Sequence, residues 1–221
     1  MGRERAAPRR APSRLPANRW LVIMAKEPRA GAVKTRLARD IGAVAATRFH
    51  RQTLDTLVKR LGSSPRWTTV LSVSPDASLM APFWPKGVML MAQGAGGLGA
   101  RMQRINDDMP PGPVVIVGSD IPAMSPDDID DAFAMLGGHD VVLGPASDGG
   151  YWLVGLKRTP SVPRIFDGVR WSSKHALADT LANAAGLEVA QIRELDDVDN
   201  GGSYRRLAGL GRLIRPAETR I

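Results

Sequence analysis

An aspartate that ends a hydrophobic run is the residue of this sequence with the sharpest chemical implication. Pro113 to Val117 is a run rich in β-branched residues, and Gly118-Ser119-Asp120-Ile121-Pro122 follows it directly. Open α/β sheets bind their ligands outside the carboxyl ends of their strands. A carboxylate there can bind Mg²⁺ or Mn²⁺ as a hard oxygen ligand, with water and donor phosphates completing the coordination. The alternative is that Asp120 only caps the following turn, a common role of aspartate.

A cationic loop precedes the first expected helix. The segment 26–37 joins a buried apolar run to a helix start and holds two lysines and two arginines. The N–H groups and the dipole of a helix start favour anions, Gly31 lets the main chain approach closely, and Lys34 and Arg36 can neutralise a di- or triphosphate. A solvated basic loop is the competing interpretation, because the segment lacks the Walker spacing. The candidate phosphate-binding residues are Lys26, Gly31, Lys34, Thr35 and Arg36, of which Lys34 is also a catalytic candidate.

A glycine-rich loop follows a later apolar run and again leads into a helical pattern. The segment 93–101 contains four glycines. They would let the main chain approach a flat base or a ribose, while Gln93 offers amide donors and acceptors and Arg101 can reach a phosphate. An adaptable surface turn is the alternative. The candidate nucleotide-binding residues of this loop are Gln93, Gly94, Gly97, Gly99 and Arg101.

Three aspartates, Asp196, Asp197 and Asp199, cluster after the last apolar run of the sequence. One of them could complete a metal site opposite Asp120, since carboxylate oxygens suit Mg²⁺ and Mn²⁺. A short acidic run that faces solvent is the alternative. The three histidines show neither a zinc-ligand nor a nucleophile spacing, and we assign them no role.

The segment Ser147-Asp148-Gly149-Gly150-Tyr151-Trp152 combines a carboxylate, a flexible turn and two aromatic side chains. Such a combination could hold a sugar or an acceptor hydroxyl. An ordinary hairpin turn is the competing interpretation. The candidate acceptor or sugar residues are Asp148, Gly149, Gly150, Tyr151 and Trp171, and Asp148 is also a candidate catalytic residue.

These residues must be positioned by an alternation of strands and helices that begins at Trp20. Such an alternation is typical of βαβ units and a mostly parallel sheet. A long helix is expected over 37–61, another after a cap at Ser125 and before Gly137, and a later one from near Ser172 or Ser173. Strands are expected over 20–25, 69–73, 88–91, 113–117, 141–143, 151–156 and 189–192.

Composition limits the class of protein. The chain has 221 residues, no cysteine and no apolar run long enough to cross a membrane. It therefore has no disulfide or thiolate metal site, and a reducing cytoplasm fits best. The formal charge of +8 is concentrated in residues 1–19, which hold six arginines and one glutamate. We expect a disordered basic tail over 1–19 and one folded domain over 20–215.

The motifs together resemble the nucleotide-diphospho-sugar transferase superfamily, in particular its small bacterial glycosyltransferase branch related to phospholactate and molybdenum-cofactor guanylyltransferases. They are, in order, G-x-V-K-T-R-L from Gly31, G-x-x-G-x-R from Gly96, G-S-D-I-P, S-D-G-G-Y-W and D-V-D. The resemblance implies a GT-A-like Rossmannoid three-layer α/β/α sandwich with a mostly parallel mixed sheet. It also implies metal ligation by Asp120 and Asp199, with Lys34 and Arg36 facing the donor phosphates. After Asp199, relatives usually continue with Thr and an acidic helix start, whereas this chain has 200–203 Asn-Gly-Gly-Ser.

We therefore expect an Mg²⁺- or Mn²⁺-dependent transferase that binds a nucleotide or nucleotide-sugar donor and a small-molecule acceptor. Glycosyl transfer from a nucleotide sugar is the first expectation. The alternative is nucleotidyl transfer, in which an NTP is joined to a phosphorylated small molecule and pyrophosphate is released. A third possibility, from another class, is a non-catalytic nucleic-acid-binding protein that uses the arginine-rich tail. The charge of the sequence outside this tail does not favour a nucleic-acid partner.

Overall fold

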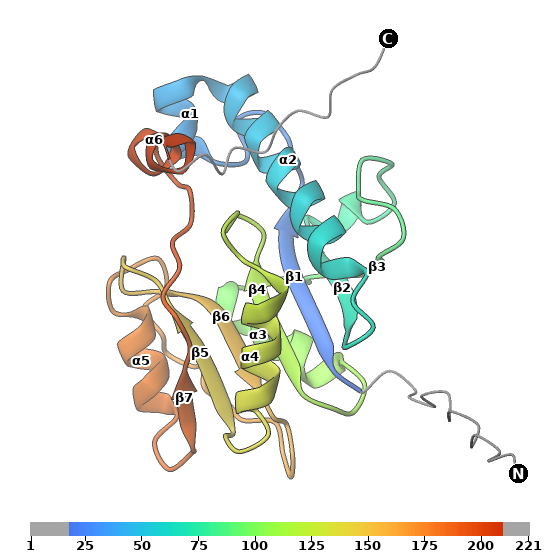
Figure 1. The fold of residues 1–221 in the computed structure, drawn as a ribbon, viewed down its shortest axis with the longest axis vertical. Coiled ribbons are helices and arrows are strands. Elements are labelled where there is room, and N and C mark those ends of the chain that lie inside the picture. Colours follow the sequence, from blue (N-terminus) through green and yellow to red (C-terminus); the bar gives the residue numbers. More distant parts are fainter. Residues whose placement is uncertain (1–17, 210–221) are drawn as a thin grey trace, which may run out of the picture.

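Seven apolar runs form one mixed sheet in the computed structural model, which describes residues 18–209 (Figure 1). The strand order is β3-β2-β1-β4-β6-β5-β7. Strand β6 runs antiparallel to β4 and β5, and the other neighbouring pairs are parallel. The expected mostly parallel mixed sheet is therefore confirmed. The strands are β1 Trp20–Lys26, β2 Thr68–Ser74, β3 Met89–Ala92, β4 Val114–Gly118, β5 Val141–Pro145, β6 Tyr151–Leu156 and β7 Val189–Gln191.

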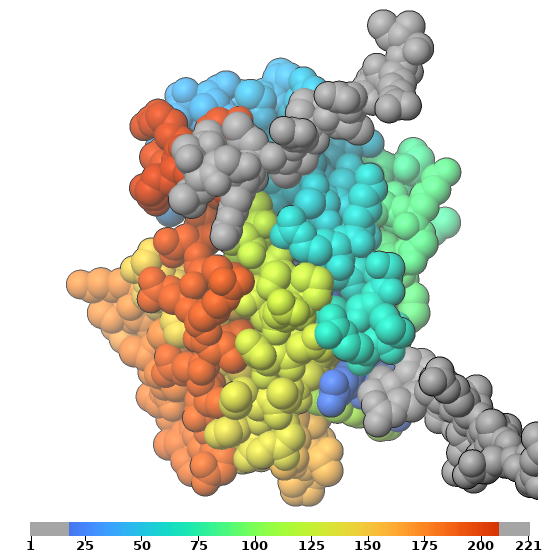
Figure 2. Space-filling view, viewed as in Figure 1, coloured from blue at the N-terminus to red at the C-terminus, as the bar shows by residue number. Residues whose placement is uncertain are grey.

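Helices cover both faces of the sheet, because the central strands carry apolar side chains on both faces. On β1, Leu21 and Ile23 face the core beneath α2 and α4, whereas Val22 faces the core beneath α3. Figure 2 shows α2 and α4 side by side on one face. The three-layer α/β/α arrangement is thereby confirmed. The helices are α1 Thr35–Ile41, α2 Ala43–Gly62, α3 Leu98–Asp108, α4 Pro126–Met135, α5 Ala176–Asn183 and α6 Gly201–Gly209, with a short 3₁₀ helix η1 at Asp76–Ser78.

The expected helix starts are confirmed in part. Ser125 caps α4, and its side chain and that of Asp128 form a reciprocal capping box. The single helix expected over 37–61 is wrong, because Gly42 adopts φ 85° and ψ 151° and separates α1 from α2. The helix expected from Ser172 or Ser173 begins later, at Ala176, after a series of turns.

A small third core fixes the chain at the carboxyl edge of the sheet. Leu37 of α1, Phe49 of α2 and Leu207 of α6 pack together, and the rings of Phe49 and Tyr204 meet edge to face at 5.3 Å. Figure 1 shows α1 and α6 lying beside each other at one end of the molecule. The chain therefore returns from β7 across the sheet to the edge where β1 and β4 end.

Two expectations fall partly outside the described residues. Residues 1–17 of the expected tail and residues 210–215 of the expected domain are not described. Within 18–209, no helix combines the length and the apolar character that a bilayer crossing requires.

Candidate active site

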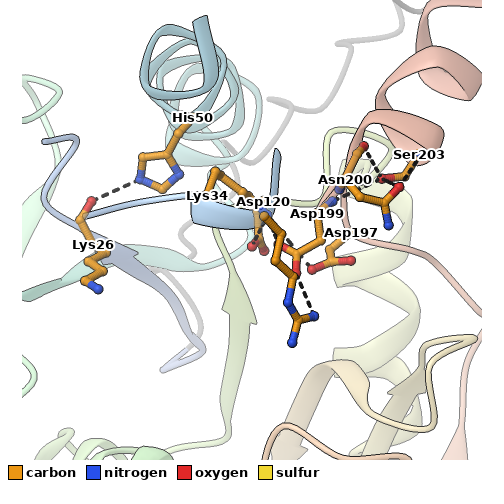
Figure 3. A network of polar contacts seen from close by, with 9 residues as sticks. Lys26, Lys34, His50, Asp120, Asp197, Asp199, Asn200 and Ser203 are labelled. Atoms are coloured by element: carbon orange, nitrogen blue, oxygen red, sulfur yellow. Dashed lines mark hydrogen bonds and ion pairs between the residues drawn. The ribbon is translucent and has the colours of Figure 1, made fainter. Parts of the chain in front are cut away.

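One ammonium group lies among three carboxylates at the carboxyl edge of the sheet (Figure 3). Lys34 Nζ donates to Asp120 Oδ2 at 2.6 Å and to Asp199 Oδ1 at 3.0 Å, and it lies 3.9 Å from Asp197 Oδ2. The Lys34 side chain is 4% exposed. One carboxylate oxygen from each aspartate lies within 4.8 Å of the others. The sequence places these residues in three distant stretches, and the fold brings them together.

Local backbone geometry explains how each side chain arrives there. Asp120 follows β4, whereas Lys34 immediately precedes α1 in a left-handed conformation with φ 48°. The N–H of Val198 donates to the carbonyl of Asp120 at 3.2 Å, which ties the acidic segment to the loop after β4. Side chains alternate in an extended chain, so Asp197 and Asp199 share one side. Asp196 instead accepts hydrogen bonds from the backbone and hydroxyl of Ser147.

Burial and charge set the electrostatics of this group. Burial alone would lower the pKa of Lys34, but Asp120 and then Asp199 and Asp197 outweigh it and raise that pKa. Lys34 is therefore a cation at neutral pH. Burial and the neighbouring carboxylates raise the pKa of Asp197 to about 6, although the Lys34 ammonium opposes the shift. Three carboxylates thus share one buried positive charge, with the more exposed Arg36 3.4 Å from Asp199.

The start of α6 supports Asp199 despite the unusual sequence that follows it. Ser203 Oγ accepts hydrogen bonds from the backbone N–H groups of Asp199 and Asn200. Asn200 Oδ1 in turn accepts from the N–H of Ser203. The acidic group missing at the helix start comes from α1, because Asp40 Oδ2 accepts from the N–H of Gly201 at 2.7 Å. A Cβ at Gly201 would lie 2.9 Å from Asp40, so this contact needs glycine.

A pocket on one side of the carboxylates is walled by the cationic loop. It is lined by Lys26, Lys34, Thr35, Arg36, His50, Gln93, Asp120 and Asp199, among others. Gly31 lies in the same loop with φ 78° and has no neighbour within 4 Å of a Cβ. His50 was not expected in a site. Its Nε2 lies 3.0 Å from the Lys26 carbonyl, its Nδ1 has no partner among the described residues, and burial lowers its pKa.

The glycine-rich loop is held mainly by two arginines of α3, of which Arg104 donates to the carbonyls of Gln93 and Ala95. Gln93 is buried, and its amide nitrogen donates to the carbonyls of Ala25 and Ser72. Arg101 donates to Gly96 O and Gln93 Oε1. These polar atoms of Gln93 and Arg101 form hydrogen bonds within the protein, so both side chains stabilise the loop in this structure. Gly94 has φ 75°, its N–H donates to Asp76, Gly97 precedes α3, and Gly99 lies inside α3.

Two hollows meet at Asp148 on the other side of the carboxylates. One is polar and is lined by Asp120, Asp148, Asp197, Asp199, Arg36 and Arg206, among others. The other is apolar and includes Asp148, Gly150, Tyr151 and Trp171. Gly149 has φ 83°, and a Cβ there would lie 2.3 Å from the Lys174 carbonyl, so it fixes the turn against the segment before α5. Gly118 lines all three hollows.

Comparison with known proteins gives one family match. A protein-family model with the description "Uncharacterized protein conserved in bacteria (DUF2064)" matches residues 53–173, which is more than half of the chain. No curated protein matches the chain.

Solved structures share the fold. A Desulfovibrio desulfuricans G20 protein, provisionally named a nucleotide-diphospho-sugar transferase, is 26% identical and has a TM-score of 0.80 over 90% of each chain. The 4-diphosphocytidyl-2C-methyl-D-erythritol synthase of Anaerococcus prevotii DSM 20548 is 9% identical, with a TM-score of 0.56 over 88% of this chain and 96% of that one. Rv0371c of Mycobacterium tuberculosis H37Rv, in complex with manganese, is 18% identical, with a TM-score of 0.51 over 87% and 98%.

Proposed function

Because this chain belongs to the DUF2064 family of conserved bacterial proteins and to the nucleotide-diphospho-sugar transferase superfamily, we propose that it moves a group from a nucleotide-linked donor with the help of a divalent metal ion. Its membership of the superfamily makes it a nucleotide-using transferase. The observation that carries the metal-dependent proposal is the convergence of Asp120, Asp197 and Asp199 on one buried cation. A buried ammonium is costly without charged partners, and such clusters of charge are typical of functional sites.

The three carboxylates fit Mg²⁺ or Mn²⁺. They offer hard oxygen ligands at close mutual distances, and the Lys34 ammonium already shows that a cation is stabilised between them. Asp120 and Asp199 are the proposed principal ligands, with Asp197 as a third. The manganese found with Rv0371c supports this choice of metals. When bound, the metal would neutralise charge that develops on the leaving phosphates.

Lys34 then has two proposed positions. Without nucleotide it neutralises the carboxylates, as its contacts with Asp120 and Asp199 show. With a metal ion between those carboxylates, like charges would repel the ammonium, and the donor phosphates would offer it a new anionic partner. Lys34 lines the pocket that Lys26, Thr35 and Arg36 also line. Donor phosphates bound in that pocket would therefore lie close to the Lys34 side chain.

Glycosyl transfer is the proposed reaction. The acceptor oxygen forms a bond to the anomeric carbon of the donor sugar while the bond from that carbon to the phosphate oxygen breaks. The electron pair stays on the leaving nucleoside diphosphate, and Lys34 and Arg36 stabilise the charge that builds there. Asp148 lines the polar hollow beside Asp120 and is the proposed acceptor of the hydroxyl proton.

Nucleotidyl transfer is the alternative, and the cationic loop is the observation that favours it. In that reaction, the acceptor oxygen bonds to the α-phosphorus of an NTP, and the bond to the β-phosphate oxygen breaks to release pyrophosphate. Four cations in 26–37 suit a triphosphate as well as a diphosphate. The Anaerococcus synthase, whose name describes a diphosphocytidyl product, has the same fold.

Product analysis tests both reactions. The full chain is incubated with Mg²⁺ or Mn²⁺ and a panel of nucleotide sugars and NTPs, and released nucleoside diphosphate and pyrophosphate are separated by chromatography. We expect Asp120→Ala to lower turnover about 100-fold, because it removes a carboxylate that would hold the metal ion. Circular dichroism should show an intact fold. Asp108→Ala, an exposed carboxylate at the end of α3, is the matched control and should keep full turnover. Full turnover of Asp120→Ala would remove Asp120 from the site.

A further inference from the structure

An apolar pocket adjoins the polar hollow beside Asp120, on the face of the sheet that α3 and α5 cover. Its walls come from the sheet through Met24, Ile116 and Val154, and from the helices through Leu98, Met102 and Ala176. Met102, Ile116 and Val154 belong to the second core cluster, and Met24 packs against it. The pocket is therefore a gap in the apolar layer between the sheet and these helices, at the carboxyl edge of the sheet.

The charges around this pocket differ from those of the neighbouring hollows. Asp148 is its one charged lining residue, and no lysine or arginine lines it in the described part of the chain. The polar hollow is lined by Arg36 and Arg206, and the pocket beside the cationic loop is lined by Lys26 and Lys34. A phosphate or carboxylate placed among these apolar walls would lose its hydration without gaining a counter-ion. An uncharged occupant fits this lining.

Two aromatic side chains give the pocket a preference for a flat or compact apolar body. The rings of Tyr151 and Trp171 meet edge to face at 6.1 Å. Trp171 rests against α3, where a Cβ on Gly99 would lie 3.0 Å from its indole nitrogen. The other four tryptophans each donate their indole N–H to a backbone carbonyl, whereas that of Trp171 has no partner in the range 18–209. Trp171 is therefore placed by packing against Gly99 and Tyr151, without a backbone hydrogen bond from its indole within 18–209.

The apolar pocket and the polar hollow share a wall. Gly118, Asp148, Gly150 and Tyr151 line both hollows. A molecule whose body lies against Trp171 can therefore present a hydroxyl to Asp148 without leaving the pocket. We propose that the acceptor is an uncharged alcohol with an aromatic or aliphatic body, bound in this pocket with its hydroxyl toward Asp148. This inference rests on the proposed function, and it disfavours the phosphorylated acceptor of the nucleotidyl alternative.

Binding of simple probes tests the inference. Benzyl alcohol and cyclohexylmethanol represent uncharged bodies, phenyl phosphate is the charged counterpart, and glycerol lacks the apolar body. Binding to the full chain is measured by saturation-transfer NMR and calorimetry, with and without Mg²⁺ and UDP-glucose. We expect the two uncharged alcohols to bind better than phenyl phosphate and glycerol.

Variants locate the binding. Trp171→Ala should weaken binding of the two alcohols on the order of 10-fold, because it removes an aromatic wall. Trp20→Ala is the matched control, since Trp20 also borders the second core cluster but lies at the start of β1, and it should bind normally. If Trp171→Ala does not fold, Leu98→Lys replaces a side chain that is 44% exposed and places a cation at the pocket. Met135→Lys on α4 is its control, at 42% exposure.

The outcomes separate this inference from the proposed function. Loss of alcohol binding in Trp171→Ala or Leu98→Lys, with normal binding in the controls, supports the acceptor pocket. Tighter binding of phenyl phosphate than of benzyl alcohol, or equal alcohol binding by pocket and control variants, overturns it. UDP-glucose binding is measured separately by calorimetry in the same samples. Alcohol binding by a chain that binds no nucleotide or nucleotide sugar would contradict the proposed function while leaving the apolar pocket intact.

Discussion

At the residue scale, Lys34 holds the centre of the group that is proposed to bind a metal ion. Its ammonium lies within 3.0 Å of two carboxylates and is shielded from solvent. Two cations cannot share that position, because unit charges a few ångströms apart repel each other strongly in a partly buried site. Metal binding and the present position of Lys34 are therefore in competition. Nucleotide phosphates would relieve this competition by attracting the lysine.

Lys34→Met should tighten Mn²⁺ binding on the order of 10-fold in the absence of nucleotide, because the competing charge is removed. Calorimetry and the EPR signal of free Mn²⁺ measure this affinity without any need for turnover. The same variant should lower turnover about 100-fold, because a charge contact to the leaving phosphates is lost. Its melting temperature should fall without metal, since the three carboxylates then lose their buried counter-ion, and Mn²⁺ should restore it.

Arg36→Met is the matched control for this prediction. Arg36 also contacts Asp199, but its side chain is 73% exposed, so its loss changes the field at the carboxylates much less. Mn²⁺ affinity of this variant should stay within about 2-fold of the original. An unchanged or weaker Mn²⁺ affinity in Lys34→Met would show that the lysine and the metal do not compete.

At the element scale, Asp128 joins the start of α4 to the segment that leads from β7 to the acidic residues. Its carboxylate completes the capping box with Ser125 and accepts from Arg193 Nη2 at 2.7 Å. Burial alone would raise the pKa of Asp128, but hydrogen bonds from Arg193 and Ser125 outweigh it and hold the pKa below its ordinary value. The ionised form is therefore the one that stabilises the fold.

Asp128→Ala should lower the free energy of unfolding by about 1 to 2 kcal/mol near neutral pH, through loss of the cap and of the ion pair. Because the folded-state pKa is depressed, this stabilisation is fully present above the unfolded pKa of about 4 and is lost as the pH falls through the folded pKa. Urea unfolding at several pH values measures it. The difference between the two proteins should shrink only below about pH 4.

Asp127→Ala is the control for that experiment. Asp127 lies in the same first turn but is exposed, so its loss should cost only about 0.3 to 1 kcal/mol through the helix dipole. Equal costs for the two substitutions would show that the buried contacts of Asp128 contribute nothing beyond the dipole.

Elements whose signals are local could be predicted from the sequence. The β-branched run of β4 and the cap at Ser125 each depend on residues close together in the chain, and both were predicted within a residue or two. The break at Gly42 was missed because apolar residues continue across it at helical spacing. Val44 lies at an apolar position of this spacing just after the break, yet its side chain is 80% exposed, so an apolar residue type did not indicate burial there.

The candidate site was predictable where residues follow strands. The positions of Lys34 and Asp120 after strands placed them at the sheet edge, and the family resemblance implied Asp199 as their partner. The structure brings these three residues together, while their roles remain predictions. The sequence did not choose between Asp196 and Asp197, because that choice depends on the extended path of the segment. His50 gave no signal either, since its place beside Lys26 depends on how α2 packs on the sheet.

At the scale of the whole molecule, charge is divided between the site and the amino-terminal segment. Residues 1–17 hold five arginines and one glutamate, which is half of the formal net charge of +8. Cations near the sheet edge are instead paired with carboxylates or placed around a pocket. If the molecule works as a nucleotide-using transferase, the basic segment is dispensable for donor binding. If it works as a nucleic-acid binder, that segment is the principal contact.

Deleting residues 1–17 separates these two possibilities. We expect Mg²⁺-dependent nucleotide binding, measured by calorimetry, to be unchanged, because the pocket within the described residues 18–209 is already lined by Lys26, Lys34 and Arg36. Any binding of single-stranded DNA at low salt should disappear, since it would depend on phosphate neutralisation by the arginines and fall steeply with salt. A chain with the five arginines changed to serine controls for length and should behave like the deletion. DNA binding that requires the five arginines, in a full chain that binds no nucleotide in the presence of Mg²⁺, would favour the nucleic-acid alternative over the transferase, because the basic segment would then be the functional part of the chain.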